Sequence, residues 1–368
     1  MNVLITGANG FIGKNMTLWL ENNNHNVLKI DKDNISLLPD YILKADFIIH
    51  LAGINRPLTK EEFYDGNTNL TKKLVDLVKA SKKDIPIIYS SSIQASLDND
   101  YGKSKLLAET YLLESGLTTY IYRLSNVFGK WCRPNYNSAI TTFCYNIANN
   151  LPIEIRDNNY IVHLNYIDDI CKTWLDVING KIKPSITTYN EIKPIYDKSL
   201  GELAALIYSF KESRNNKFVI DQGDTFIKKL YATYLSYLPT NEFKYVLDMH
   251  IDNRGSFTEV LKTLNNGQIS INVGKPGIIK GNHYHNTKNE KFLVLSGTCS
   301  IKFRKIDSDE IIEYITSGDK LEVVDIPVGY THSITNIGTT DSVTLMWANE
   351  LFDKDNPDTY FMEVIKND

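Results

Sequence analysis

Apolar runs and helical patterns alternate along the first part of the chain. Apolar runs, each long enough for one buried strand, lie at residues 2–6, 26–30, 47–52, 85–89 and 119–124. Between the third and fourth runs, Leu70, Leu74, Leu77 and Val78 recur at helical spacing and predict one buried helix face. Strands that alternate with helices in this way indicate an α/β fold built on a parallel sheet.

The pattern changes twice in the later part of the chain. From about Leu200 it predicts amphipathic helix with loops, and from about Tyr245 apolar and polar positions alternate between turn residues, which predicts strands. We therefore expect two domains, residues 1–245 and residues 246–368, the second of them all-β. A chain of 368 residues, 42% of them hydrophobic, can bury a core in each.

Composition excludes several classes of protein. The net charge is -4 and the basic residues are spread along the chain, so we expect no nucleic acid and no membrane as partner. No run approaches the roughly 18 apolar residues of a membrane span. The four cysteines form no CxxC pair, which favours a reduced, cytoplasmic compartment.

Three glycines follow the first apolar run. Gly7, Gly10 and Gly13 stand before a helical pattern, where the bare backbone can approach a pyrophosphate at the positive end of the helix. This spacing resembles that of the extended short-chain dehydrogenase/reductase family, which implies a Rossmann-type doubly wound sheet and a nicotinamide cofactor. The cofactor contacts would be Gly7, Gly10, Phe11, Ile12, Gly13, Asp31, Leu51, Ala52, Gly53, Tyr101 and Lys105.

Asp31 ends the second apolar run. A carboxylate there can accept hydrogen bonds from the adenine ribose and repel a 2′-phosphate, which favours NADH. Lys32, beside it, would favour NADPH. These two residues leave the choice between NADPH and NADH open.

Ser90, Ser91 and Ser92 follow the fourth run, and Tyr101 and Lys105 come four residues apart. Residues four apart share a helix face, so we expect Lys105 to lower the pKa of Tyr101, which could then protonate a carbonyl oxygen. Such a pair also arises by chance in a chain with 22 tyrosines. The order of the motifs resembles the reductase family, which implies Ser92, Tyr101 and Lys105 as catalytic residues.

Two residues after the fifth run are candidates for substrate binding. Asn126 opens an Asn-Val-Phe-Gly sequence that is similar to the family's Asn-x-x-Gly turn, which implies contact with the phosphates of a nucleotide sugar. Arg133, in the next loop, is either a diphosphate partner or an ordinary surface arginine.

Histidines gather in the last third of the chain. His283 and His285 would project to the same side of a strand, and Glu290 can return beside them on the next strand. These groups suit zinc or another divalent transition metal. Their spacing resembles the first signature of the cupin family. A second signature, at residues 327–336, implies His332 as the fourth ligand and a jelly-roll barrel.

The same region admits another interpretation. Residues 252–259 and 277–284 also resemble the nucleotide-sugar 3,5-epimerases, in which a histidine at the position of His283 removes a proton beside a ketone without a metal. His283 is therefore either a metal ligand or a general base. If it is a ligand, the base lies elsewhere, and the metal is structural or polarises the carbonyl.

Together the two halves resemble the bifunctional epimerase/reductase family of bacterial capsule and O-antigen synthesis. The resemblance implies a UDP-linked 4-keto-6-deoxy amino sugar, UDP-2-acetamido-2,6-dideoxy-β-L-arabino-4-hexulose, as substrate. It implies C3 epimerisation, then C4 reduction by NADPH to the L-talo sugar nucleotide, on the way to UDP-N-acetyl-L-fucosamine. A homodimer is also expected.

Two other functions fit parts of the sequence. One is a single-activity reductase whose cupin half is structural or binds sugar, and the intact metal-ligand set counts against it. The other is a regulatory sugar-binding cupin fused to a degenerate reductase. The intact glycine turn and Tyr101 count against that function.

Overall fold

The structure, a computed structural model, describes residues 1–366 and divides into two compact units. The first consists of Met1–Ser209 and Gln222–Thr240, and the second of Phe210–Asp221 and the chain from Asn241 onwards. The segments 210–221 and 241–245, both expected in the first domain, thus belong to the second unit. The first of them pairs with a strand of that unit, because Val219 N donates to Lys262 O at 2.8 Å. The last two residues of the expected second domain lie outside the described range.

A parallel sheet with strand order β2-β1-β3-β4-β5 forms the centre of the first unit. Its strands are β1 (Asn2–Thr6), β2 (Asn26–Ile30), β3 (Phe47–His50), β4 (Ile87–Ser92) and β5 (Thr119–Leu124). Every predicted apolar run is a strand. The third ends two residues earlier than predicted, and the fourth begins two residues later, at Ile87, and extends to Ser92 because its serines pair with β5.

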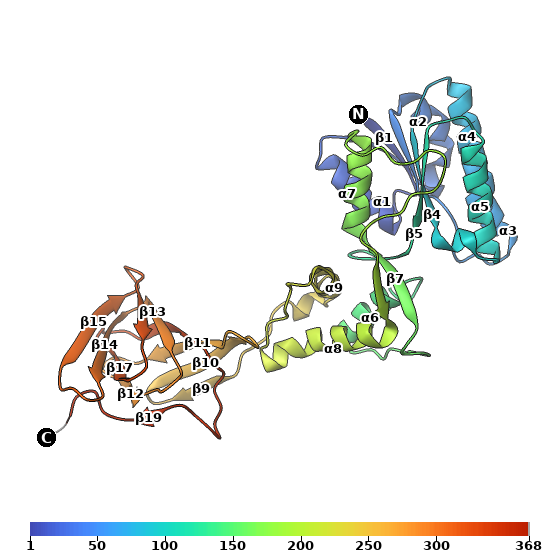
Figure 1. The fold of residues 1–368 in the computed structure, drawn as a ribbon. Coiled ribbons are helices and arrows are strands. Elements are labelled where there is room, and N and C mark those ends of the chain that lie inside the picture. Colours follow the sequence, from blue (N-terminus) through green and yellow to red (C-terminus); the bar gives the residue numbers. More distant parts are fainter. Residues whose placement is uncertain (367–368) are drawn as a thin grey trace. The chain divides into compact units, whose positions relative to one another are not determined.

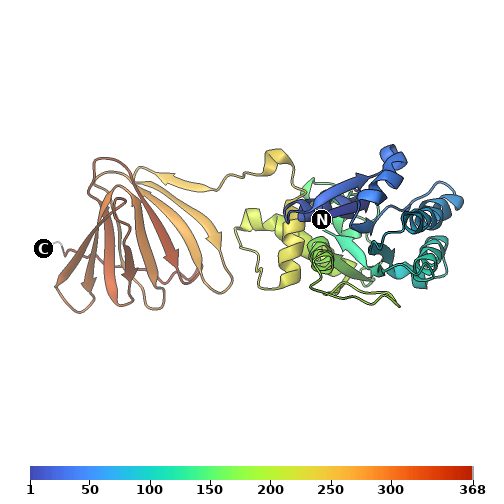
Figure 2. The same ribbon diagram turned by 90° about the horizontal axis from the view of Figure 1, so that it is seen from above.

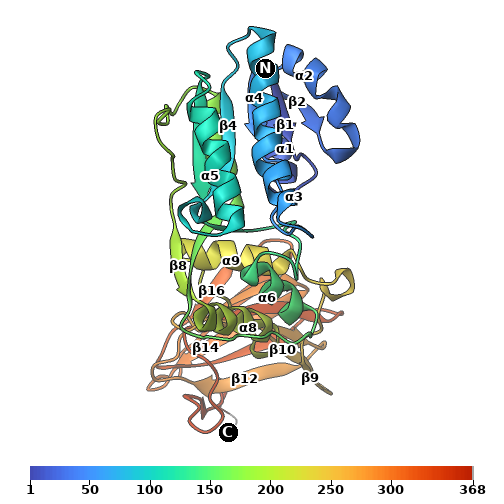
Figure 3. The ribbon, with the colours of Figure 1, turned by 90° about the vertical axis from the view of Figure 1, so that its right-hand side faces the viewer.

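Helices cover both faces of this sheet (Figure 1). One face packs against α1 (Phe11–Glu21) and α7 (Ile167–Ile178). The other packs against α2 (Leu38–Lys44), α4 (Leu70–Ser81) and α5 (Asp100–Leu113), which is the face turned to the viewer in Figure 3. The predicted buried face of α4 is confirmed for Leu74 and Val78, which are fully buried.

The remaining elements of the first unit follow these strands and helices. They are η1 (Lys32–Leu37), α3 (Glu61–Phe63), η2 (Tyr64–Asn69), η3 (Ile93–Ser96), β6 (Asn126–Phe128), α6 (Ala139–Ala148), β7 (Ile161–Tyr166), β8 (Tyr196–Ser199) and α9 (Thr225–Leu235). A small sheet has the order β6-β7-β8. Helix α8 (Leu200–Asn216) begins in the first unit and ends in the second.

Two antiparallel sheets form the second unit, with orders β16-β13-β18-β11-β10-β9 and β15-β14-β17-β12-β19 (Figure 2). The elements are η4 (Thr240–Glu242), β9 (Met249–Asp252), β10 (Gly255–Lys262), β11 (Gln268–Gly274), β12 (Ile279–Tyr284), β13 (Glu290–Ser296), β14 (Thr298–Lys305), β15 (Ile311–Ser317), β16 (Val323–Ile326), β17 (Tyr330–Asn336), β18 (Ser342–Ala348) and β19 (Tyr360–Phe361). Residues of both sheets, among them Phe292 and Ile301, share one core.

The predicted fold class, a Rossmann-type parallel sheet followed by an all-β antiparallel part, is confirmed. Within residues 1–366, no helix has the length and apolar character needed to cross a bilayer.

Candidate functional sites

The glycine turn lies between β1 and α1 and requires glycine at two positions. Gly7 has φ +74°, and a Cβ on Gly13 would lie 2.3 Å from the Gly7 carbonyl oxygen. Gly10 precedes α1 and gives it no side-chain cap, so the first N–H groups of the helix are available to an anion. Phe11 and Ile12 form the first turn of that helix.

Asp31 lies beside the glycine turn. Its carboxylate accepts hydrogen bonds from Asn9 N and Lys32 N, both at 2.9 Å, and it caps the 3-10 helix η1. A carboxylate has about four lone-pair positions, so the two remaining can still accept ribose hydroxyls. Asp31 is therefore both a structural cap and a candidate reader of the ribose.

The turn Leu51–Gly53 follows β3 and is held by a buried histidine that sequence analysis did not single out. His50 Nδ1 lies 2.6 Å from Thr6 Oγ1, and its Nε2 lies 3.0 Å from Thr71 Oγ1. Burial, followed by the charge of Lys105, lowers the pKa of His50 to about 3, so the ring is neutral. Thr6 Oγ1 also accepts from Ala52 N at 3.3 Å, which joins the network to the turn.

Ser92, Tyr101 and Lys105 come together where β4 meets α5. Lys105 Nζ donates to the Ser90 carbonyl oxygen at 3.0 Å and lies 4.9 Å from the centroid of the Tyr89 ring. A Cβ on Gly53 would lie 3.3 Å from the same Nζ, so the turn after β3 is adjacent. Three separate motifs therefore meet at the carboxyl ends of β1, β3 and β4.

The predicted effect of Lys105 on Tyr101 is wrong. Burial raises the pKa of Tyr101 above its usual value. A hydrogen bond with Ser92 lowers this pKa, but by less than burial raises it. The ammonium instead donates to a main-chain carbonyl. Burial also lowers the pKa of Lys105 to about 8, and the charge of Glu109 opposes that shift.

Glu109 and Arg123 form a buried ion pair behind these residues. Arg123 donates to both carboxylate oxygens of Glu109, at 2.9 and 2.7 Å, and Ser91 Oγ lies 2.5 Å from Oε1. Arg123 also donates to Ser96 Oγ at 2.8 Å. The pair therefore fixes the short connection from Ser92 to Tyr101. Glu109 lies one helical turn beyond Lys105, a spacing that could have identified it.

Asn126 and Arg133 occupy exposed positions in the first unit. Asn126 Nδ2 donates to His163 O at 3.2 Å. The guanidinium of Arg133 lies 5.0 Å from the centroid of the Tyr136 ring. The guanidinium of Arg56, a residue in the loop after β3, lies at the same distance from that ring. Two guanidiniums on one ring could hold a diphosphate. No motif marked Arg56.

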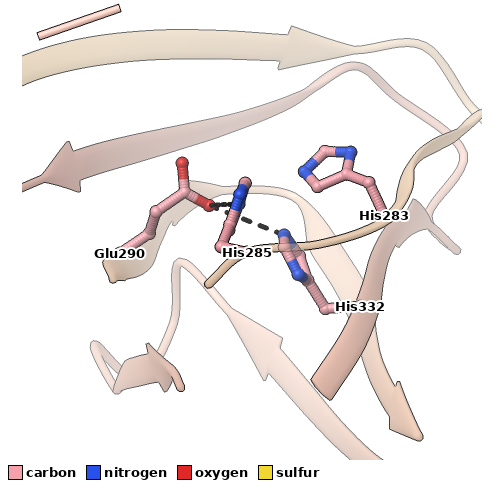
Figure 4. A group of neighbouring side chains, drawn as sticks. All are labelled: His283, His285, Glu290 and His332. Carbon is pink, nitrogen blue, oxygen red and sulfur yellow. Dashed lines mark ion pairs between the residues drawn. The ribbon is translucent and has the colours of Figure 1, made fainter. Parts of the chain in front are cut away.

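The four predicted metal ligands converge in the second unit (Figure 4). Their ligand atoms lie within 4.8 Å of one another. His283 is on β12 and His285 directly follows it, while Glu290 begins β13 and His332 lies on β17. Glu290 Oε2 lies 3.4 Å from His285 Nε2 and 3.5 Å from His332 Nε2.

The chemistry of this cluster fits a divalent cation. His285 Nδ1 donates to the Asp358 carbonyl oxygen, which leaves a lone pair on Nε2, a buried atom without a hydrogen-bond partner among residues 1–366. Burial raises the pKa of Glu290, but the neighbouring imidazoles of His285 and His332 lower it by more, so its carboxylate is charged. The imidazole lone pair and the carboxylate are both electron-rich and face each other, so a cation bound between them would stabilise both.

His283 is neutral in this cluster. Burial, then the neighbouring His332 and His285, lower its pKa to about 4. A neutral imidazole can bind a metal or accept a proton, so both interpretations of His283 remain compatible with the geometry.

Comparisons with known proteins define the class. Residues 3–189 match the NAD dependent epimerase/dehydratase family, and residues 250–360 match the polysaccharide biosynthesis C-terminal domain. The chain therefore belongs to the NAD-dependent epimerase/dehydratase family, with a second domain of the polysaccharide biosynthesis type. Membership implies use of NAD(P)(H).

Two relatives match from end to end. The UDP-2-acetamido-2,6-beta-L-arabino-hexul-4-ose reductase of Pseudomonas aeruginosa is 45% identical over 370 residues and 99% of both chains. The capsular polysaccharide assembling protein CapF of Staphylococcus aureus is 50% identical, with a TM-score of 0.93 over 99% of this chain and 100% of that one. The resemblance to the capsule epimerase/reductase family is thus confirmed, and the chain belongs with these two proteins.

A more distant structure shows the fold alone. The UDP-glucose 4-epimerase of Thermotoga maritima is 15% identical, with a TM-score of 0.55 over 64% of this chain and 98% of its own.

Proposed function

We propose that the chain is a bifunctional enzyme of capsule or O-antigen synthesis. It epimerises C3 of UDP-2-acetamido-2,6-dideoxy-β-L-arabino-4-hexulose and reduces the C4 ketone with NADPH to UDP-2-acetamido-2,6-dideoxy-β-L-talose, a precursor of UDP-N-acetyl-L-fucosamine. The likeness to the P. aeruginosa reductase over 99% of both chains carries the proposal.

The first unit would reduce the C4 ketone. When bound, the nicotinamide supplies the hydride. Ser92 donates a hydrogen bond to the carbonyl oxygen, and Tyr101 gives its proton to the alkoxide that forms. Lys105, whose ammonium donates to the Ser90 carbonyl beside Gly53, would contact the bound nicotinamide cofactor. The glycine turn and the first turn of α1 would bind the pyrophosphate of the cofactor.

The two steps must occur in a fixed order. A ketone at C4 makes the C3 hydrogen acidic, because the carbanion delocalises onto the ketone as an enolate. Reduction of C4 removes that acidity. Epimerisation by the second unit therefore precedes reduction by the first.

The second unit would hold zinc or another divalent transition metal through His283, His285, Glu290 and His332. When bound, the metal supplies positive charge that can polarise the ketone or stabilise the fold. If His283 is not a ligand, its neutral imidazole takes the C3 proton instead.

The UDP group would contact the exposed loops of the first unit. Asn126 and Arg133 would face its diphosphate, and Arg56 would join them because it packs on the same tyrosine ring as Arg133. We expect the enzyme to work as a homodimer.

The proposal is tested by incubating the purified protein with the 4-keto sugar nucleotide and NADPH or NADH. The expected result is oxidation of NADPH and formation of the L-talo product, identified by NMR. If neither nicotinamide is consumed, the reductase assignment is wrong. If the product keeps the C3 configuration of the substrate, the chain is a single-activity reductase.

A further inference from the structure

The C-terminal segment of the chain runs beside the cluster of His283, His285, Glu290 and His332. Strand β19 pairs with β12, with Phe361 opposite His283. Arg304 donates to the carbonyl oxygens of Val364 and Glu363 at 2.9 and 2.7 Å. The segment is therefore anchored on both sides of the strand that carries His283.

Asp358, just before β19, binds the turn that connects two of the candidate ligands. Its Oδ2 accepts hydrogen bonds from Thr287 N at 2.7 Å, Lys288 N at 2.8 Å and Asn286 N at 3.0 Å. The Thr287 hydroxyl donates to the same oxygen at 3.1 Å. Successive main-chain N–H groups around one anion form a nest, so this turn is shaped around the Asp358 carboxylate. The turn leads from His285 to Glu290.

The main chain of Asp358 makes a separate contact with the cluster. Its carbonyl oxygen accepts the Nδ1 proton of His285, which fixes the tautomer and leaves the Nε2 lone pair toward Glu290. Histidine ligands in proteins generally donate their second ring N–H in this way, and the acceptor orients the ring. One residue thus sets both the tautomer of His285 and the path of the turn to Glu290.

We propose that Asp358 is a positioning residue that determines how tightly the cluster retains its metal. This inference rests on the metal part of the proposed function. The competing explanation is that Asp358 only fastens the C-terminal segment to the barrel. That explanation requires a loss of stability without a change in metal affinity.

The test compares Asp358→Ala and Asp358→Asn with the wild type, with zinc ions as the probe. Zinc affinity and the rate of zinc transfer to a chelator are measured on the full-length chain. Asp358→Ala removes every contact of the carboxylate, and we expect zinc affinity to fall about 10- to 100-fold. In Asp358→Asn, an amide oxygen at the Oδ2 position keeps the hydrogen bonds of Thr287 and Lys288, so we expect a smaller loss.

Asp355→Ala is the matched control, because Asp355 is an exposed aspartate in the same segment. It should retain wild-type zinc affinity. Melting of the zinc-free proteins separates positioning from fastening, since fastening alone lowers the melting of zinc-free and zinc-loaded protein equally. If Asp358→Ala does not fold, Asp358→Asn carries the same comparison.

Each outcome decides the inference. Wild-type zinc affinity in both Asp358 variants overturns it and leaves the metal site intact. A wild-type protein that binds no zinc, or whose zinc is unaffected by His285→Ala, overturns it together with the metal part of the proposed function.

Discussion

Burial shifts the pKa values of Lys105 and of two side chains in the same part of the first unit, His50 and Tyr101. It lowers the pKa of Lys105 to about 8 and that of His50 to about 3, and it raises the pKa of Tyr101. His50 is consequently a fixed, neutral hydrogen-bonding group. Lys105 is poised to lose its proton just above neutral pH. These properties follow from packing, because none of the three lies in an exposed position.

Tyr101→Phe tests the proton donor. Removal of the hydroxyl should reduce the C4 reduction rate by about 10²- to 10⁴-fold, the usual contribution of a general acid. Exchange at C3 should remain, since the variant leaves the second unit unchanged. NADPH oxidation and C3 deuterium exchange are measured on the same preparation. Tyr111→Phe, on the exposed part of α5, is the control. Loss of both activities in Tyr101→Phe would contradict separate sites.

Glu109→Gln tests the electrostatic role of the buried ion pair. The Glu109 charge raises the pKa of Lys105 and so opposes the effect of burial. Without that charge the ammonium is less stable and its pKa falls. As the pH rises, the reduction rate should fall once Lys105 loses its proton. In the wild type we expect this fall from about pH 8, and in the variant it should begin at a lower pH. The pH profile of kcat measures this shift. An unchanged alkaline limb would show that Lys105 does not control it.

At the scale of elements, local pattern predicted the strands of the first unit well. Each of its apolar runs is a strand of the sheet. The spacing of apolar residues indicates whether a segment is buried. It does not indicate which distant segment packs against it. The pairing of β19 with β12 and of residue 219 with β10 depends on contacts between residues far apart in sequence. Neither of these two pairings could be inferred from one amino-acid sequence.

Asp31→Ala tests the two roles of Asp31, which lies between β2 and η1. If the carboxylate reads the ribose and repels a 2′-phosphate, the ratio of kcat/KM for NADPH to that for NADH should rise. The variant should also lose about 1 kcal/mol of stability, because Asp31 caps η1. Steady-state kinetics with both cofactors and urea unfolding measure the two effects. An equal ratio in variant and wild type would place Asp31 outside the cofactor site.

At the scale of the whole molecule, short motifs in the sequence identified candidate residues that the structure brings together. The four candidate metal ligands converge, and Gly53 of the turn after β3 lies beside Lys105. Residues that support them from a distance were missed: His50, Arg56, Glu109 and Asp358. His50, Arg56 and Asp358 act through partners tens of residues away in the sequence, which leave no fixed spacing, whereas Glu109 follows Lys105 by one helical turn.

Metal removal should affect the two units differently. Without a cation, the charged Glu290 faces a buried imidazole lone pair, which destabilises the second unit. A chelator, or the substitution His285→Ala, should lower the melting temperature of the second unit and leave that of the first. Calorimetry with metal analysis measures both. A melting profile that is insensitive to the chelator would refute the ligand assignment.

We propose that the second unit epimerises C3 and the first unit reduces C4. Proton NMR in deuterated buffer tests this assignment most directly. The 4-keto sugar nucleotide is incubated with full-length protein and no nicotinamide. We expect deuterium at C3 with the wild type and with Tyr101→Phe, but not with His283→Ala. No exchange in the wild type, with NADPH oxidation intact, would contradict the account and leave a reductase with a structural second domain.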